Sequence, residues 1–112
     1  VLDKGSLATI GHSQPAKLLH VIVDNEAHES TGGQATVSSA IDFATIAAGC
    51  GYRNIWRVDS PEALAAAVKE GVSKPGPNLV HVKVSISSAA DLGRPGLTPI
   101  EVKDQFMGWL AR

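Results

Sequence analysis

Three short apolar runs, separated from one another by segments of helical pattern, most constrain the fold of this chain. They are Lys17–Val23, Asn54–Val58 and Leu79–Ser85. The first run is apolar on both faces except at His20, and the third begins in the same way, which is typical of parallel strands covered on both sides. Strands that alternate with helices predict an α/β domain with a mostly parallel sheet, right-handed crossovers and helices on both faces.

Two helices are predicted from residues that end them. A short helix over Leu7–Ile10 is expected to stop at Gly11 and Pro15, because proline cannot continue a helix and glycine favours its end. A second helix is predicted over Ser39–Cys50, which is apolar nearly all round, with Gly51 as its C-cap.

Two further helices are predicted from residues that begin them. Ser60 suits the N-cap position and Pro61 the first helical position. The stretch from Thr98 to Glu101 is a capping box with a proline at its first helical position. Each helix then carries an apolar stripe, which is Leu64, Val68 and Val72 in the first, and Val102, Phe106, Trp109 and Leu110 in the second.

The composition excludes several classes of protein. The 112 residues are enough for one domain, and a net charge of −1 gives no electrostatic reason to expect binding to nucleic acid or to an anionic membrane. No apolar run approaches the roughly 20 residues of a membrane span. The single cysteine, Cys50, cannot form an internal disulfide and is interpreted as a small buried hydrophobic residue. A reducing, cytoplasmic location is therefore expected.

The segment Asp24–Gln34 (DNEAHESTGGQ) is the candidate site, because it follows a predicted buried strand directly and is polar and glycine-rich. Ligands of open α/β sheets bind beyond the carboxyl ends of strands. Glycines allow close backbone approach, backbone N–H groups and hydroxyls bind anions, and the Asn25 side-chain oxygen suits a hard cation such as Mg²⁺. These features suggest a phosphate-plus-metal site. A solvated loop with Asx turns at Asp24 and Asn25 explains them equally well.

Three stretches carry a resemblance to a known family. They are GSLATIG near the start, VDNEAHESTGGQATVS in the middle and DLGRPGLTPIEVKDQFM near the end. Together they resemble the thiamine-diphosphate-dependent enzymes, and more narrowly the phosphonopyruvate decarboxylases and the β-part of the sulfopyruvate decarboxylases. The resemblance extends over essentially the whole chain and falls on the C-terminal domain that binds the diphosphate. It implies a partial thiamine-diphosphate-binding fold over residues 1–112.

The resemblance also implies roles for individual residues. Asn25 would bind Mg²⁺ through its side-chain oxygen and Ala27 through its backbone carbonyl, and the metal would hold the diphosphate. The cofactor-binding residues implied in this way are Asn25, Ala27, His28, Ser30, Thr31, Gly32 and Gly33. No catalytic residue is assigned, and His28 is the candidate for one. Glu26 and Glu29 are interpreted as solvated, because a bound diphosphate disfavours nearby carboxylates.

One part of the family pattern is missing. In the family, a Gly-Asp-Gly motif lies at one strand end, and its Asp precedes the metal-binding Asn by about 27 residues. Asp3-Lys4-Gly5 does not match, because Asp3 lies 22 residues before Asn25 and no glycine precedes it. The missing Asp would lie two positions before Val1. The chain is therefore expected to be a fragment that begins just after the first metal ligand.

Two functions remain open at this stage. In the first, the intact protein is a carboxy-lyase that decarboxylates a small anionic 2-oxo acid, phosphonopyruvate or sulfopyruvate, with help from a pyrimidine-binding domain or subunit, while this fragment alone is inactive. In the second, the chain is an inert α/β module that folds without binding cofactor. A homo-oligomer is expected in either case, because a missing strand exposes backbone and apolar surface.

Several conspicuous side chains are interpreted as structural. His20 and His81 lie within predicted strands and are expected to be satisfied core or edge residues rather than ligands. Trp56 and Trp109 are interpreted as packing or interface residues. Arg94 is a candidate anion contact, for which a surface loop position is the simpler interpretation.

Overall fold

The computed structural model describes residues 5–28, 32–87, 91, 93 and 96–112. Its helices and strands follow one another along the chain as α1 (Gly5–Ser13), β1 (Leu19–Asp24), β2 (Ala27–His28), β3 (Gln34–Ala35), the 3-10 helix η2 (Val37–Ala40), α2 (Phe43–Gly49), β4 (Asn54–Val58), α3 (Pro61–Ser73), β5 (Asn78–Lys83) and α4 (Pro99–Leu110).

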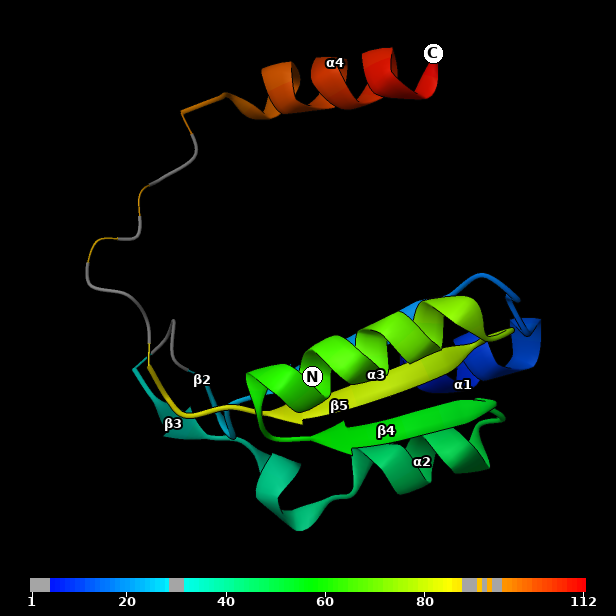
Figure 1. The fold of residues 1–112 in the computed structure, drawn as a ribbon. Coiled ribbons are helices and arrows are strands. Elements are labelled where there is room, and N and C mark those ends of the chain that lie inside the picture. The colour runs from blue at the N-terminus through cyan, green and yellow to red at the C-terminus, as the bar shows by residue number, and fades with distance from the viewer. Residues whose placement is uncertain (1–4, 29–31, 88–90, 92, 94–95) are drawn as a thin grey trace.

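The main sheet is fully parallel and has the strand order β1-β5-β4. α3 covers one face and α2 the other, while α1 packs beside α2 (Figure 1). The predicted α/β class, with helices on both faces of a parallel sheet, is therefore confirmed. The carboxyl ends of all three strands lie at the same end of the sheet, next to the small antiparallel hairpin of β2 and β3.

The core lies between the sheet and the layer formed by α1 and α2. Its buried members are Leu7, Ile22, Phe43, Ala47, Tyr52 and Leu79. On the other face, α3 approaches the sheet closely because Gly71 has no side chain. A Cβ at Gly71 would stand 2.7 Å from a methyl carbon of Leu19. The helices on the two faces of the sheet thus cover β5, the central strand, which is buried from Asn78 to Val82.

Two predicted helix boundaries are wrong. α1 does not stop at Gly11 but continues to Ser13, and Gly11 is buried where the helix touches the turn after α2. The helix predicted over Ser39–Cys50 begins only at Phe43, because Asp42 is its N-cap and accepts hydrogen bonds from two backbone N–H groups of the first turn. The preceding residues form the 3-10 helix η2 instead.

The predicted starts of α3 and α4 are confirmed. Ser60 accepts a hydrogen bond from the backbone N–H of Ala63, and Pro61 occupies the first turn of α3. Thr98 and Glu101 form the complete capping box of α4. Two strands are shifted along the chain from their predicted bounds, β1 to Leu19–Asp24 and β5 to Asn78–Lys83.

The prediction that the first strand is covered on both faces is wrong for this structure. On the face that α3 covers, Val21 is 39% exposed and Val23 is 64% exposed, because α3 lies over β4 and β5 and reaches only the start of β1. No described strand pairs with the outer edge of β1. The same strand therefore presents both an unpaired edge and an uncovered apolar face.

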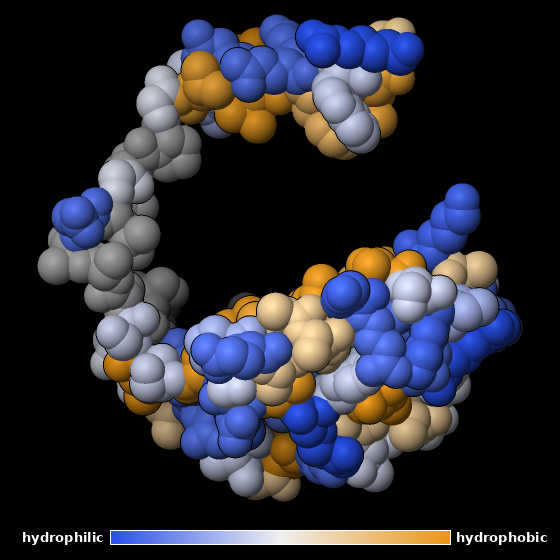
Figure 2. All heavy atoms as spheres, in the orientation of Figure 1, coloured by the Kyte–Doolittle hydropathy of each residue, from blue (hydrophilic) through white to orange (hydrophobic). Residues whose placement is uncertain are grey.

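α4 has no buried residue, and its large apolar side chains are exposed. They gather along one side of the helix (Figure 2). Among the described residues, no helix is long and apolar enough to span a membrane.

Candidate functional site

The predicted site begins with two consecutive Asx turns at the carboxyl end of β1. The Oδ1 atom of Asp24 accepts a hydrogen bond from the backbone N–H of Glu26 (3.0 Å). The Oδ1 atom of Asn25 accepts one from the backbone N–H of Ala27 (3.2 Å). Glu26, between them, has a φ of +58°, in the left-handed region that few residues other than glycine adopt. The turn chemistry that the sequence suggested is thus present.

The backbone of the hairpin sets the direction of the Ala27 carbonyl. Glu26 and His28 both direct their carbonyls toward β3, since the first accepts from the N–H of Thr36 (2.8 Å) and the second from that of Gly33 (2.9 Å). Successive carbonyls of an extended strand point to opposite sides. The Ala27 carbonyl therefore points away from β3, to the side on which the Ala27 N–H meets Asn25.

The remaining predicted cofactor residues divide into two groups. His28 is half-buried in β2, and Gly32 and Gly33 follow with φ values of +120° and +76° that suit glycine. The N–H of Gly33 is used within the hairpin. Ser30 and Thr31, and Glu29 beside them, lie outside the described residues, as do Asp3 and Arg94.

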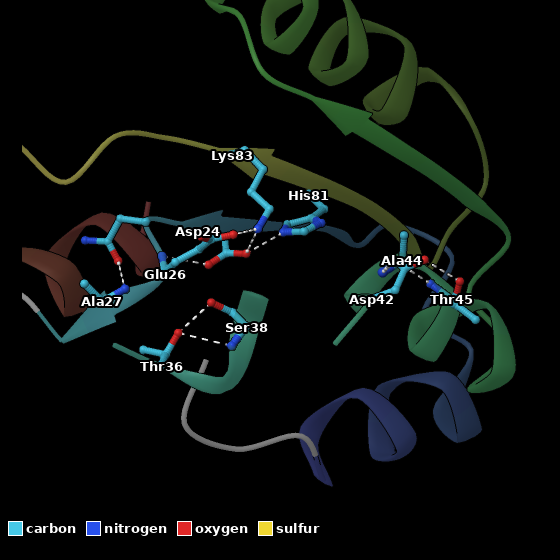
Figure 3. Close-up of polar contacts among 11 residues, drawn as sticks. Asp24, Glu26, Ala27, Thr36, Ser38, Asp42, Ala44, Thr45, His81 and Lys83 are labelled. Atoms are coloured by element: carbon cyan, nitrogen blue, oxygen red, sulfur yellow. Dashed lines mark hydrogen bonds and ion pairs between the residues drawn. The ribbon is translucent and has the colours of Figure 1, made fainter. Parts of the chain in front are cut away.

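Behind the turn lies a buried ionic cluster that the sequence did not reveal (Figure 3). Asp24 is only 6% exposed, and its Oδ2 atom lies 3.0 Å from Nε2 of His81 and 3.2 Å from Nζ of Lys83. Burial by itself would raise the pKa of Asp24. Hydrogen bonds from His81, Ser38, the Glu26 N–H and Lys83 outweigh it and hold the pKa far below its usual range, so the carboxylate is charged at neutral pH.

Lys83 links this cluster to the exposed side of the turn. Its ammonium group forms an ion pair with the carboxylate of Glu26 as well as with Asp24. The hydrogen bond to Glu26, followed by the contacts with Asp24, raises the pKa of Lys83. Glu26 was interpreted as solvated, and its side chain is indeed 45% exposed, but it is paired.

The interpretation of both strand histidines as satisfied residues is confirmed. His81 is buried, bonded to Asp24, and packed edge-on against Phe43 with ring centroids 5.5 Å apart. His20 is half-buried, and its Nδ1 atom lies 3.0 Å from the hydroxyl of Tyr52. Burial lowers the pKa of His20.

The burial of Asp24 escaped prediction because it depends on strand order. Asp24 and Lys83 are the last residues of β1 and β5, and these strands pair in register from Leu19 opposite Asn78 to Asp24 opposite Lys83. Two apolar strands that each end in a charged residue of opposite sign carry a signal for such a pair. That signal can be used only once the two strands are known to be neighbours.

A cavity of about 420 Å³ lies at the carboxyl ends of β4 and β5, on the other side of His81 from the turn. Its lining includes both acidic and basic side chains. One pair of these, Arg57 and Asp42, already forms an ion pair, with Nη2 and Oδ2 2.6 Å apart. Asn25 and Ala27 do not line this cavity. The predicted site is instead a half-buried shelf just beyond the carboxyl end of β1.

The donor set of the shelf fits a hard cation. The amide oxygen of Asn25 has two lone pairs, so it can accept the Ala27 N–H and still bind a metal. Together with the Ala27 carbonyl it offers two neutral oxygens, which is the ligand type that Mg²⁺ uses beside water and phosphate oxygens. No cluster of three histidine, cysteine or carboxylate side chains that could hold a metal occurs among the described residues.

Comparison with known proteins shows the family to which the chain belongs. Residues 4–82 match the family model described as the C-terminal TPP binding domain of thiamine pyrophosphate enzymes, thiamine pyrophosphate being another name for thiamine diphosphate. The chain is 43% identical over 106 residues to a phosphonopyruvate decarboxylase of Streptomyces viridochromogenes. It is 36% identical over 107 residues to the beta subunit of a sulfopyruvate decarboxylase of Methanococcus maripaludis.

These alignments take in nearly all of this chain, 95% and 96% respectively, but only part of each relative. The chain spans 27% of the Streptomyces protein and 57% of the Methanococcus subunit. The family match covers the sheet, the turn and the hairpin described above. The chain belongs to the family of C-terminal, thiamine-pyrophosphate-binding domains of thiamine pyrophosphate enzymes.

Proposed function

We propose that this chain is the diphosphate-binding part of a larger thiamine-diphosphate-dependent decarboxylase that acts on a small 2-oxo acid with a phosphonate or sulfonate group. The observation that carries the proposal is the turn at the end of β1. It directs the Asn25 oxygen and the Ala27 carbonyl to the same side of the hairpin, at the strand end where α/β proteins bind ligands. The names of the relatives support the substrate class.

In this function Asn25 and Ala27 would hold Mg²⁺, and the metal would in turn bind the diphosphate. The positive φ values of Gly32 and Gly33 let the backbone approach the phosphates closely. Ser30 and Thr31 are proposed as further diphosphate contacts, and His28 as the side chain nearest the substrate. When bound, thiamine diphosphate would supply a nucleophilic thiazolium carbon and a cationic ring that can act as an electron sink, which is the chemistry that decarboxylation of a 2-oxo acid requires.

The topology indicates where a further metal ligand would come from. α2 joins β1 to β4 across one face of the sheet, and α1 lies on that same face. A right-handed crossover through α1 therefore requires any strand that precedes α1 to lie at the outer edge of β1. A Gly-Asp-Gly motif at the end of such a strand would stand directly beside Asn25. We propose that this unpaired edge receives that strand.

The proposal also requires a pyrimidine-binding domain or subunit, which in this family carries the glutamate that activates the cofactor. The beta-subunit relative supports a separate subunit, and the longer relatives support a domain on the same chain. The unpaired thiol of Cys50 supports a cytoplasmic location.

The test uses the full-length protein, meaning the product of the complete reading frame that contains this sequence, together with any subunit that copurifies with it. Calorimetry should show micromolar binding of thiamine diphosphate in the presence of Mg²⁺, and phosphonopyruvate or sulfopyruvate should lose CO₂. Asn25→Ala should abolish Mg²⁺-dependent cofactor binding, because one of two protein oxygens on the described shelf is lost.

Asn25→Asp is the matched control, since it keeps an oxygen at the same place and should retain Mg²⁺-dependent binding. Full turnover by Asn25→Ala at low cofactor concentration would refute the assignment of the metal site. A folded full-length protein that binds no thiamine diphosphate at all would refute the function itself and favour the inert module.

A further inference from the structure

The two proposed metal ligands depend on one strained residue. Asn25 and Ala27 are separated by Glu26, whose φ of +58° lies in the left-handed region. For a residue with a side chain this conformation is unfavourable by about 1–2 kcal/mol, and it persists only where the surroundings hold it. If Glu26 relaxed to an ordinary extended conformation, the Asn25 side chain and the Ala27 carbonyl would separate.

Three contacts hold Glu26. Its N–H donates to Oδ1 of Asp24, its carbonyl accepts from the N–H of Thr36, and its carboxylate pairs with the ammonium group of Lys83. The first of these contacts is made by Asp24 and the third by Lys83. Both residues belong to the buried ionic cluster, which consists of Asp24, His81 and Lys83. The N–H of Glu26 is thus fixed by a side chain that is itself almost completely buried.

Asp24 cannot rotate away from this role without losing other partners. Its Oδ2 atom is held by His81 from the middle of β5 and by Lys83 from the end of that strand (Figure 3). His81 is fixed in turn by its edge-on contact with Phe43 of α2. The chain of contacts therefore runs from the core, through the carboxylate, to the turn.

We propose that Asp24 is a positioning residue for the metal shelf, and that His81 and Lys83 orient its carboxylate for this purpose. The inference rests on the proposed function, since it takes Asn25 and Ala27 as the metal ligands. Asp24 itself is not taken as a ligand in this arrangement, because it is only 6% exposed and its Oδ2 atom is held by His81 and Lys83. It acts by keeping Glu26 in the conformation that brings the two ligand oxygens together.

The test compares Asp24→Ala with Asp24→Asn in the full-length protein. Calorimetry measures the dissociation constant of Mg²⁺ at fixed thiamine diphosphate, and kcat is measured at saturating metal and cofactor. Asp24→Ala should weaken Mg²⁺ binding about 10–100-fold, as is usual when a residue that orients a ligand is removed. Its kcat at saturation should stay within about twofold of the unaltered value, because the reacting groups are untouched.

Asp24→Asn should restore much of the affinity, because an amide oxygen can still accept the Glu26 N–H. A residue needed only for stability would lower the melting temperature without changing the Mg²⁺ requirement. Equal Mg²⁺ affinity in Asp24→Ala and the unaltered protein would overturn the inference, and so would total loss of metal binding in Asp24→Asn, which would make Asp24 a direct ligand.

Lys83→Met supplies a second variant in case the alanine variant does not fold, since the Lys83 side chain is 43% exposed. It should weaken Mg²⁺ binding by about fivefold, the scale of one partly exposed ion pair. Arg57→Met is its control, because it also removes a cation paired with an aspartate near the carboxyl end of the neighbouring strand β4. Equal effects of the two variants would overturn the inference.

The outcomes separate this inference from the function on which it rests. If the unaltered full-length protein binds no thiamine diphosphate with Mg²⁺, both fall together. If the unaltered protein binds and Asn25→Ala does not, while Asp24→Ala binds normally, the proposed function stands and the positioning role is overturned.

Discussion

At the scale of single residues, two glycines of similar sequence context have opposite roles. Gly11 lies inside α1 and is buried against the turn that follows α2, where a Cβ would stand 1.7 Å from the carbonyl oxygen of Cys50. Gly49 lies at the end of α2, and a Cβ there would meet nothing within 4 Å. The first glycine allows two helices to touch, whereas the second only weakens its own helix.

Gly11→Ala should therefore destabilise the protein by about 3 kcal/mol, the upper part of the usual range for overpacking, because the atom it would strike belongs to the backbone and cannot rotate away. Urea unfolding followed by tryptophan fluorescence measures the change. Gly49→Ala is the matched control and should stabilise by about 0.5–1 kcal/mol, since alanine is the better helix former. A Gly11→Ala variant as stable as the unaltered chain would show that α1 does not dock as described.

The same residue shows what sequence could and could not predict. Gly11 was expected to stop the helix, which is the commonest local role of glycine, and only the contact with Cys50, 39 positions away, reveals the other role. The sequence predicted an Asx turn at Asp24, which the structure contains, but the burial of Asp24 depends on β5 lying beside β1. The local turn was predictable at Asp24 and the local role of Gly11 was not, and neither tertiary contact could be predicted from the sequence.

At the scale of elements, the start of α2 shows how one side chain can redefine a helix. The Asp42 carboxylate accepts hydrogen bonds from the N–H groups of Ala44 and Thr45 and from the Thr45 hydroxyl, and it pairs with Arg57. The hydrogen bonds from Thr45 and Arg57 hold the pKa of Asp42 well below its usual range. The apolar pattern extended the prediction to Ser39, because it does not register where a cap interrupts the helix.

Asp42→Asn should change the acid dependence of stability. A carboxylate with a lowered pKa stabilises the folded state above its unfolded pKa of about 3.9, and this contribution is lost as the pH falls through the lower folded value. Asparagine also caps helices, so the variant removes the charge and keeps the cap. The urea midpoint of the variant should be below that of the unaltered chain at pH 7, and the gap should narrow as the pH falls below about 4 toward the lowered folded pKa.

Asp104→Asn is the control for that titration, because its carboxylate pairs with the adjacent Lys103 on α4, a helix with no buried residue. It should shift neither the midpoint nor the pH dependence. A constant gap between Asp42→Asn and the unaltered chain from pH 7 to pH 2 would contradict the role assigned to the Asp42 charge.

At the scale of the whole molecule, two groups of exposed apolar side chains lie on single elements of the described chain. One is the uncovered face of β1 with Val21 and Val23, and the other is the stripe of α4. In that stripe, the rings of Phe106 and Trp109 stack with centroids 6.3 Å apart, and both side chains are more than half exposed. A single helix of 12 residues is only marginally stable in water, even with a good cap, so packing of this stripe is needed to hold α4.

Sequence patterning found this stripe correctly, as it found the α/β class, because both follow from spacing along one segment. It could not say what covers the stripe. Val102, Phe106, Trp109 and Leu110 have the pattern of a helix packed on a core, yet in the part of the chain that the structure describes each of these side chains is about half exposed or more. An apolar stripe predicts that this face of the helix will be buried. It does not identify the surface that buries it, which depends on how the whole assembly is built.

We therefore expect this 112-residue chain to self-associate through the α4 stripe, in line with the homo-oligomer expected from its sequence. Phe106→Glu places a charge in the centre of the stripe and should weaken association at least about tenfold, as the loss of a buried aromatic contact usually does. Gln105→Glu introduces the same charge beside the stripe rather than within it and should leave association unchanged. Sedimentation equilibrium measures both, and a monodisperse monomer for the unaltered chain would show that some other surface, not a second copy, covers α4.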